Sequence, residues 1–357
     1  MKNKVEDAEP TEGKAWPTVM NWVGRITALI GLFASLAGGI TWLVRHHTLE
    51  TERKTKMALA EAQAEQGDYQ ASVATYGEIL KEDSTYRPAL DLQLSTAELW
   101  IENFHAIAPE GQDTSTTAVA QLDQIMPILD GGLARSKGSQ AADVQAHIGW
   151  AHWLNEKIAE REFGAAAEQN LRAALKLDPH NVYANAMLGN WILQNDGDFG
   201  EAMHDFDVAA ATGKVRPFVR QFELGGLRYL DKKGARAAQV RVANDMRKNG
   251  EPLDDEYKSR ILSFCFDPIV TDRGELTEAL SAVPPDEAWK TYLWLDDNPH
   301  QEDHIMVHEF IRANLLEVSG DKAGSLAKFR TLQQELKNAD GSMKSSVDAA
   351  VTRLSHG

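Results

Sequence analysis

A pattern of glycine, aspartate, small and aromatic residues recurs at fixed spacing along this chain of 357 residues. Its clearest copy, residues 181–211, contains Leu188-Gly189, Gly197-Asp198-Phe199, Ala202, Phe206 and Ala209. Gly189 and Ala202 allow two helices to approach closely, and Gly197 can adopt the conformation that ends a helix. Phe206 can fill the groove between neighbouring units. The pattern predicts antiparallel helical hairpins, which bury their apolar sides by stacking in series.

Related copies lie on both sides of this unit. The N-terminal copy contains Leu59-Ala60, Gly67-Asp68-Tyr69, Ser72, Tyr76 and Ile79. The C-terminal copy contains Gly320-Asp321-Lys322, Ser325, Phe329 and Leu332. A preceding unit has Ile148-Gly149-Trp150, extra residues before Ala167, and Pro179 at its end, and a degenerate unit has Leu224-Gly225 and Gly234. Recurrence of one pattern at several places favours a repeat architecture over a chance match.

These residues resemble the tetratricopeptide repeat. In that family a Leu-Gly pair packs the first helix, a Gly-Asp-aromatic turn joins the two helices, and a small residue lies where they cross. The resemblance implies an all-α fold, a tetratricopeptide-like α-solenoid of antiparallel helical hairpins. Sustained strand alternation with hairpin turns is not found in the sequence, which agrees with this fold class.

The resemblance also implies a binding surface, because members of the family bind proteins on the concave face lined by the first helix of each unit. The positions that would lie on this face are Met57, Glu61, Ala64, Asn190 and Leu193. Some relatives hold a peptide's terminal carboxylate there with Lys, Arg and Asn. Ala186 stands where those relatives use Lys, which disfavours a carboxylate clamp.

An apolar segment at residues 26–44 precedes the repeats. Its 19 residues carry no charge and just span a hydrocarbon core of about 30 Å as a helix. A cleaved signal peptide is the alternative, with Ala34-Ser35-Leu36-Ala37 as a cleavage site, but cleavage there would leave the apolar residues GGITWLV at the new terminus. The segment therefore predicts a single-pass anchor, in a bacterial-type inner membrane.

Basic residues flank the apolar segment more densely on its C-terminal side, at Arg45, Arg53, Lys54 and Lys56. This bias favours a cytoplasmic location for the repeats, and a periplasmic one stays open because large domains translocate regardless of such charges. Thr27, Gly31, Ser35 and Gly39 form one small-residue stripe, which indicates self-association of the anchor or the ordinary abundance of small residues in membrane helices.

The expected organisation of the chain follows from these features. We expect a polar tail at 1–25, a transmembrane helix at 26–44 and a juxtamembrane linker at 45–55. An N-terminal helical repeat region should span 56–136, central repeats 140–250, and degenerate C-terminal repeats 253–355.

Composition and motifs disfavour several classes of function. The formal net charge of −16 argues against nucleic-acid binding, which needs a cationic footprint. Phosphate-binding loops and nucleophile elbows are not found, and the single cysteine, Cys265, lies in an apolar stretch typical of a buried thiol. His300, His304 and His308 are spaced to form one helical stripe, which could bind zinc or be an exposed polar face.

These observations predict a membrane-anchored interaction scaffold for protein or peptide partners, with no enzymatic activity and no cofactor. A chaperone-like assembly or quality-control factor is the first alternative. A metal-binding sensor that uses the histidine stripe is the second.

Overall fold

The computed structural model describes residues 45–105, 113–158, 164–212, 217–227, 234–267, 271–296, 302–337 and 341–356. Within these ranges the regular secondary structure is helical and no strand is present, which confirms the all-α prediction. In the same ranges, no helix has both the length and the apolar character needed to cross a membrane. The predicted anchor at 26–44, with Thr27, Gly31, Ser35 and Gly39, lies outside the described residues.

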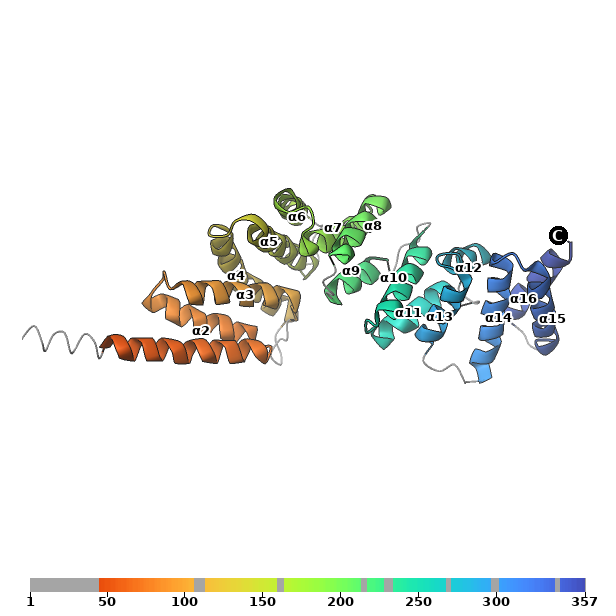
Figure 1. The fold of residues 1–357 in the computed structure, drawn as a ribbon, viewed down its shortest axis with the longest axis horizontal. Coiled ribbons are helices and arrows are strands. Elements are labelled where there is room, and N and C mark those ends of the chain that lie inside the picture. The colour runs from red at the N-terminus through yellow and green to blue at the C-terminus, as the bar shows by residue number, and fades with distance from the viewer. Residues whose placement is uncertain are drawn as a thin grey trace, which may run out of the picture. The chain divides into compact units, whose positions relative to one another are not determined.

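The chain divides into two compact units, Met1–Trp100 and Ile101–Gly357. In the first unit a helix over residues 45–65 is followed by α2 (Tyr69–Glu82) and by α3 (Arg87–Glu102), which continues into the second unit (Figure 1). Tyr76, Ile79, Ala60 and Ala89 form a small apolar core between these helices. Burial of such a cluster stabilises the packed helices, since a short isolated helix is marginal in water.

The second unit contains thirteen further helices within its described residues, in the chain order seen in Figure 1: α4 (Thr114–Leu133), α5 (Gly138–Ile158), α6 (Ala165–Leu177), α7 (Val182–Gln194), α8 (Phe199–Ala211), α9 (Pro217–Leu227), α10 (Ala235–Asn249), α11 (Asp255–Phe266), α12 (Arg273–Leu280), α13 (Pro285–Leu295), α14 (Glu302–Val318), α15 (Lys322–Glu335) and α16 (Ser342–His356). The most extensive packing joins neighbours in sequence, notably α5 with α6, α7 with α8, and α14 with α15. Packing between successive helices makes this unit solenoid-like.

Three hairpins share an aspartate cap at the start of their second helix. Asp68, Asp198 and Asp321 each cap the second helix of a hairpin with their side chains. The capping oxygens accept the backbone N–H groups of residues 71, 201 and 324 at 3.1, 2.8 and 2.9 Å. A carboxylate in this place satisfies one of the four free N–H groups at a helix start.

The interiors of the three hairpins also correspond. Ser72, Ala202 and Ser325 are fully buried at the helix crossing, and one turn later Tyr76, Phe206 and Phe329 are at most 1% exposed. The Ser325 hydroxyl donates a hydrogen bond of 2.8 Å to the carbonyl of Ala313 on α14. The recurring sequence pattern therefore places small and aromatic residues at equivalent positions in separate hairpins.

The turn of the central hairpin departs from its prediction. Gly67 and Gly320 adopt the left-handed conformation at φ +80° and +90°, but in the central hairpin Asp196 takes this conformation, at φ +54°. Gly197 therefore does not supply the left-handed residue. Its role is close approach, since a Cβ atom there would lie 2.7 Å from Cγ2 of Ile192. The expected function of Gly197 was wrong because an aspartate, which tolerates the left-handed region, precedes it.

Close helix crossing at Gly189 is confirmed. A Cβ atom on Gly189 would lie 2.9 Å from the carbonyl oxygen of Ala202 and 3.0 Å from Phe206. Gly149 has the same role in the preceding hairpin, where a Cβ atom would lie 2.8 Å from Leu171. Only glycine allows these backbones to approach so closely without displacement of the neighbouring helix.

Candidate functional site

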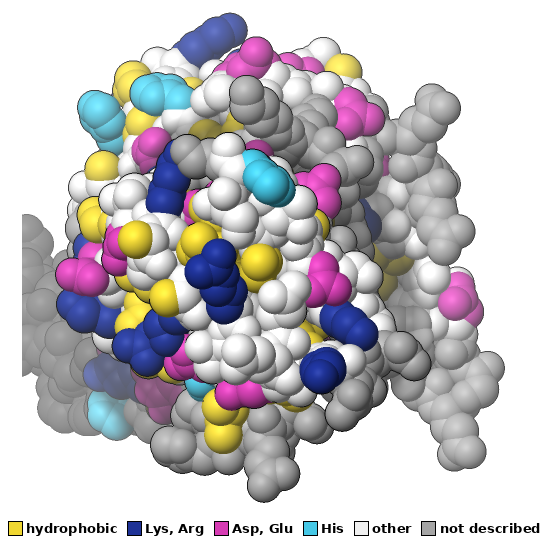
Figure 2. All heavy atoms as spheres, turned by 90° about the vertical axis from the view of Figure 1, so that its right-hand side faces the viewer, with side chains coloured by type: hydrophobic (Ala, Val, Ile, Leu, Met, Phe, Trp, Pro, Cys, Tyr) yellow, Lys and Arg dark blue, Asp and Glu magenta, His cyan; other side chains and the backbone are white. Residues whose placement is uncertain are grey.

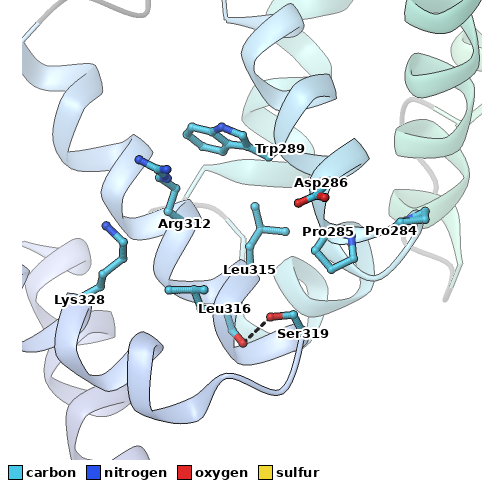
Figure 3. A pocket seen from close by; sticks show the side chains of 9 residues that line it. All are labelled: Pro284, Pro285, Asp286, Trp289, Arg312, Leu315, Leu316, Ser319 and Lys328. Atoms are coloured by element: carbon cyan, nitrogen blue, oxygen red, sulfur yellow. Dashed lines mark hydrogen bonds between the residues drawn. The ribbon is translucent and has the colours of Figure 1, made fainter.

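A cleft opens between α13 and the α14–α15 hairpin. It has a volume of about 440 Å³ and is lined by Pro284, Pro285, Asp286, Trp289, Arg312, Leu315, Leu316, Ser319 and Lys328 (Figure 3). Its size lies in the range of ligand-binding clefts. It combines an apolar floor with charged groups, which makes it the candidate binding site of the second unit.

The geometry of α14 explains why these residues meet. Arg312, Leu315, Leu316 and Ser319 are separated by three, four and seven positions, so they share one side of the helix. Across the cleft, Pro285 occupies the first turn of α13, where a missing N–H costs nothing. The cleft is thus framed by one side of α14 and the start of α13.

Aromatic packing fixes the wall formed by Trp289. The indole stacks on Tyr292 with 5.6 Å between ring centroids and meets His308 edge-on at 5.9 Å. The Nε2 atom of His308 lies 2.7 Å from a carboxylate oxygen of Asp296, which is 5% exposed. These contacts orient the Trp289 ring, which is half-buried.

Two cations line the edge of the cleft. The Arg312 guanidinium lies over the Trp289 ring, 5.1 Å from its centroid, a distance within the range of a cation–π contact. Lys328 donates a hydrogen bond to Glu309, and a nitrogen of Arg312 lies 3.7 Å from the same carboxylate. The side chain of Arg312 is 52% exposed. At this edge one carboxylate therefore balances two cations, whereas Asp286, the acidic residue that lines the cleft, lies at the other end.

A second cavity, of about 350 Å³, lies near α9 and α10 and has the opposite charge balance. Its Arg220 side chain bonds both Glu223 and Glu251, at 3.0 and 3.3 Å. Burial raises the pKa of the Glu223 carboxyl to about 7 against the opposing effect of Arg220. A cation already shared by two carboxylates has little attraction left for an anionic ligand.

The predicted groove residues differ in their exposure. Met57 packs against the apolar core of the first unit, Glu61 is exposed, and Ala64 is half-buried. In the second unit Asn190 and Leu193 are 1% and 3% exposed. At these two positions the expected open face is closed.

The cause of this closure is α9. Gly226 of this helix approaches α7 so closely that a Cβ atom on it would lie 2.7 Å from Leu193 and 3.5 Å from Asn190 Oδ1. Asn190 Oδ1 also accepts a hydrogen bond of 3.1 Å from Gln194. The family pattern describes one hairpin at a time and contains no information about this later helix.

Aromatic side chains reinforce the closure. Phe218 of α9 stacks on Tyr183 with 5.4 Å between ring centroids and lies 5.2 Å from Trp150. Phe222, one turn later, contacts Trp150 and Trp153 at 5.0 and 5.9 Å. Each pair adds to the stability gained by burial alone. In the described structure α9 is therefore an integral part of the packing on this face.

The predicted histidine stripe is only partly described. His300 lies outside the described residues, and the side chain of His304, on α14, is also outside them. His308 is described and pairs with Asp296. Within the part of the chain that is described, no cluster of three or more His, Cys, Asp or Glu residues could hold a metal ion.

Cys265 matches its expected environment. The thiol is fully buried and lies 3.8 Å from the carbonyl oxygen of Arg236. Burial raises the pKa of Cys265, which keeps it protonated and unreactive. The buried-thiol interpretation is confirmed.

Sequence reasoning missed the cleft. The available signal was the helical spacing of Arg312, Leu315 and Leu316, an amphipathic stripe with a cation in it. Such stripes usually face a neighbouring helix.

Comparison with models of known protein families gave no match to this sequence, and comparison with individual curated proteins gave none either.

Proposed function

We propose that this protein is a membrane-tethered interaction scaffold, in which a tetratricopeptide-like array of helical hairpins recruits a partner protein. The observation that carries the proposal is the correspondence of three hairpins. In each, an aspartate caps the second helix, a small residue lies at the crossing, and an aromatic residue fills the interior. Proteins built from such hairpins act mainly by presenting surface to other proteins.

The cleft between α13 and α14–α15 supports binding as its activity. Its ionisable lining side chains are Asp286, Arg312 and Lys328, and the remaining lining residues are apolar or Ser319. Acid–base or nucleophilic catalysis needs a positioned pair of groups with suitable pKa values. A cationic edge beside an apolar floor supplies charge and contact area, which suit recognition.

The sequence of residues 26–44 is the reason why the proposed function includes a membrane tether. An uncharged apolar stretch of this length suits a single pass through a bacterial-type inner membrane. The basic flank at Arg45, Arg53, Lys54 and Lys56 favours a cytoplasmic array. The small-residue stripe from Thr27 to Gly39 would let two tethers pair.

Membrane fractionation tests the tether. The full chain should stay with membranes after an alkaline carbonate wash, and a variant lacking residues 26–44 should be released. A full chain that appears in the soluble fraction would remove the tether from the proposed function.

Site-specific photocrosslinking tests the scaffold. A photoreactive amino acid at Leu316, in the cleft, should give one discrete adduct in cells that express the full chain. The same amino acid at Leu177, which is 51% exposed on α6, serves as the matched control. A broad smear of adducts at both positions would instead favour the chaperone-like alternative, and the absence of any adduct at every exposed position would refute partner recruitment.

A further inference from the structure

We propose that the cleft between α13 and the α14–α15 hairpin binds an extended acidic peptide segment, in which an Asp or Glu side chain adjoins an apolar one. This inference rests on the proposed scaffold function and specifies the chemistry of the partner. It is carried by the geometry of Arg312, Lys328 and Trp289 beside an apolar floor.

The cationic edge determines the charge of the partner. Glu309 lies against both Lys328 and Arg312, so two positive groups share one negative group. A carboxylate from a partner would restore the balance, and the planar guanidinium can bind it through two parallel hydrogen bonds. The net charge of the chain, −16, repels an acidic ligand at long range, so the two cations of this edge attract the ligand only at short distance.

The side chain of Arg312 is preorganised for such a ligand. Its guanidinium lies over the Trp289 ring, and that ring is in turn oriented by Tyr292 and His308. The arginine still exposes 52% of its side chain, so its outer N–H groups can reach a partner. A side chain fixed before binding loses less conformational entropy when the ligand arrives.

The floor of the cleft determines the apolar part of the partner. Leu315 and Leu316 lie between the cations and the prolines, with Trp289 above them in Figure 3. An apolar side chain placed there is removed from water on several sides, which stabilises the complex in proportion to the area buried. A cleft of about 440 Å³ has room for a few side chains of an extended segment.

The two ends of the cleft differ in charge, which orients the ligand. Asp286 lies at the α13 end beside Pro285, whereas Lys328 lies at the α15 end (Figure 3). The acidic side chain of the peptide should face Arg312 and Lys328, and its apolar neighbour should lie toward the prolines. A peptide with acidic groups at both ends would be repelled by Asp286.

The C-terminal face of this unit is otherwise mixed in charge. Figure 2 shows Lys and Arg side chains interspersed with acidic, histidine and hydrophobic ones, without one continuous basic surface. Nucleic acid needs an extended array of cations to displace its counterions. A short acidic peptide needs only the local pair, which is why a peptide is the ligand we infer.

A peptide selection tests the inference. The full chain, purified in a mild detergent, is used to select binders from a random-peptide library displayed on phage. The enriched peptides should contain Asp or Glu next to Leu, Ile, Phe or Met. A synthetic copy of the best one should bind at least about tenfold more weakly when its acidic residues are changed to Asn and Gln.

Variants of the cleft locate the binding. Arg312→Glu and Lys328→Glu should each weaken the selected peptide at least about tenfold, measured by fluorescence anisotropy. Arg330→Glu is the matched control, because Arg330 is exposed on the same helix, α15, and does not line the cleft. It should change the affinity by less than about twofold. Circular dichroism of each variant verifies the fold.

Glu309→Gln should change the peptide affinity in the opposite direction, toward tighter binding. Removal of the carboxylate that Arg312 and Lys328 share frees both cations, so the acidic peptide should bind about threefold or more tightly. A merely structural role for Glu309 would produce a loss of affinity. The gain therefore distinguishes electrostatic recognition from general stability of the hairpin.

The possible failures separate this inference from the proposed function. Neutral or basic peptides among the binders, or equal binding by the cleft variants, would overturn the acidic-peptide assignment. The same holds if no peptide is enriched. If partner adducts still form at positions away from the cleft, the scaffold function survives; if no adduct forms anywhere, both proposals fail.

Discussion

The central hairpin α7–α8 and the C-terminal hairpin α14–α15 have the same interior and different outer faces. Phe206 and Phe329 fill the two interiors, and alignment on them pairs Asp205 with Lys328. In the first helices, alignment of the crossing residues Gly189 and Ala313 pairs Leu188, which is 1% exposed, with the half-exposed Arg312. Equivalent positions are thus buried in one hairpin and line an open cleft in the other.

This difference shows that the repeat pattern determines the inside of a hairpin, whereas the neighbouring helices determine its surface. In the central stack α5 and α6 both pack against α7, so Leu188 is removed from water. Beside α14, the start of α13 leaves a gap that Arg312 and Leu316 line. Partner recognition can therefore differ between hairpins of one fold.

Exchange of the aligned residues Leu188 and Arg312 should have the largest effect on stability. Leu188→Arg would bury a charge without a partner and should lower the free energy of unfolding by at least about 4 kcal/mol. The reciprocal Arg312→Leu should stay within about 1 kcal/mol of the wild type, because it replaces an exposed cation. Chemical denaturation followed by circular dichroism measures both. Equal effects of the two changes would contradict the distinction between a closed and an open face.

Truncation of the shared interior should affect both hairpins alike. Phe206→Ala and Phe329→Ala each remove a fully buried ring and should cost about 3–5 kcal/mol in unfolding free energy. Leu177→Ala, at a position 51% exposed, is the control and should cost less than about 0.5 kcal/mol. If one phenylalanine tolerates the change while the other does not, the two interiors are not equivalent.

Sequence reasoning was accurate where local pattern and packing coincide. Ala202, Ser325 and the aromatic residues behind them lie at the hairpin interior, as their spacing predicts, because helical periodicity places them on one side of a helix. The class of fold and the crossing at Gly189 follow from the same periodicity. These features depend on residues within one hairpin.

The errors arose where distant segments meet. Asn190 and Leu193 have the spacing of groove residues, but Gly226 of α9 brings another helix onto them. The sequence did not predict a role for Arg312, because its exposure depends on the position of α13 beside α14. No single-hairpin pattern contains these tertiary contacts, so the closed central face and the open cleft could not be predicted from the sequence.

Asp205, which aligns with Lys328 when the two hairpins are superposed on their phenylalanines, gives a pH-dependent test of the comparison. Asp205 is 7% exposed and one of its carboxylate oxygens is buried without a hydrogen-bond partner. Burial raises the pKa of Asp205 from 3.8 to about 6, so the folded chain retains a proton that the unfolded chain has released. This group therefore lowers stability progressively as the pH rises from about 4 to about 6, and the loss persists above that pH.

Asp205→Asn should remove this loss. The variant should be more stable than the wild type by up to about 3 kcal/mol at pH 8, and the gain should vanish below about pH 4. Thermal unfolding across this pH range measures the difference. A gain for Asp205→Asn that is independent of pH would exclude the titration as its cause.

The smallest expected effects concern how closely the helices cross. Gly189→Ala places a methyl group 2.9 Å from the carbonyl oxygen of Ala202, so the helices must shift and unfolding free energy should fall by about 1–3 kcal/mol. Gly77→Ala is the control, since its Cβ would lie 3.7 Å from Gln93, and it should gain about 0.5–1 kcal/mol from helix propensity. The C-terminal hairpin already carries a methyl group at the aligned position, Ala313, which is fully buried. Ala313→Gly should therefore cost about 1–2 kcal/mol, because helix propensity falls and a buried methyl group is lost. If Gly189→Ala instead stabilises the chain, as at Gly77, then the central crossing is no tighter than the C-terminal one.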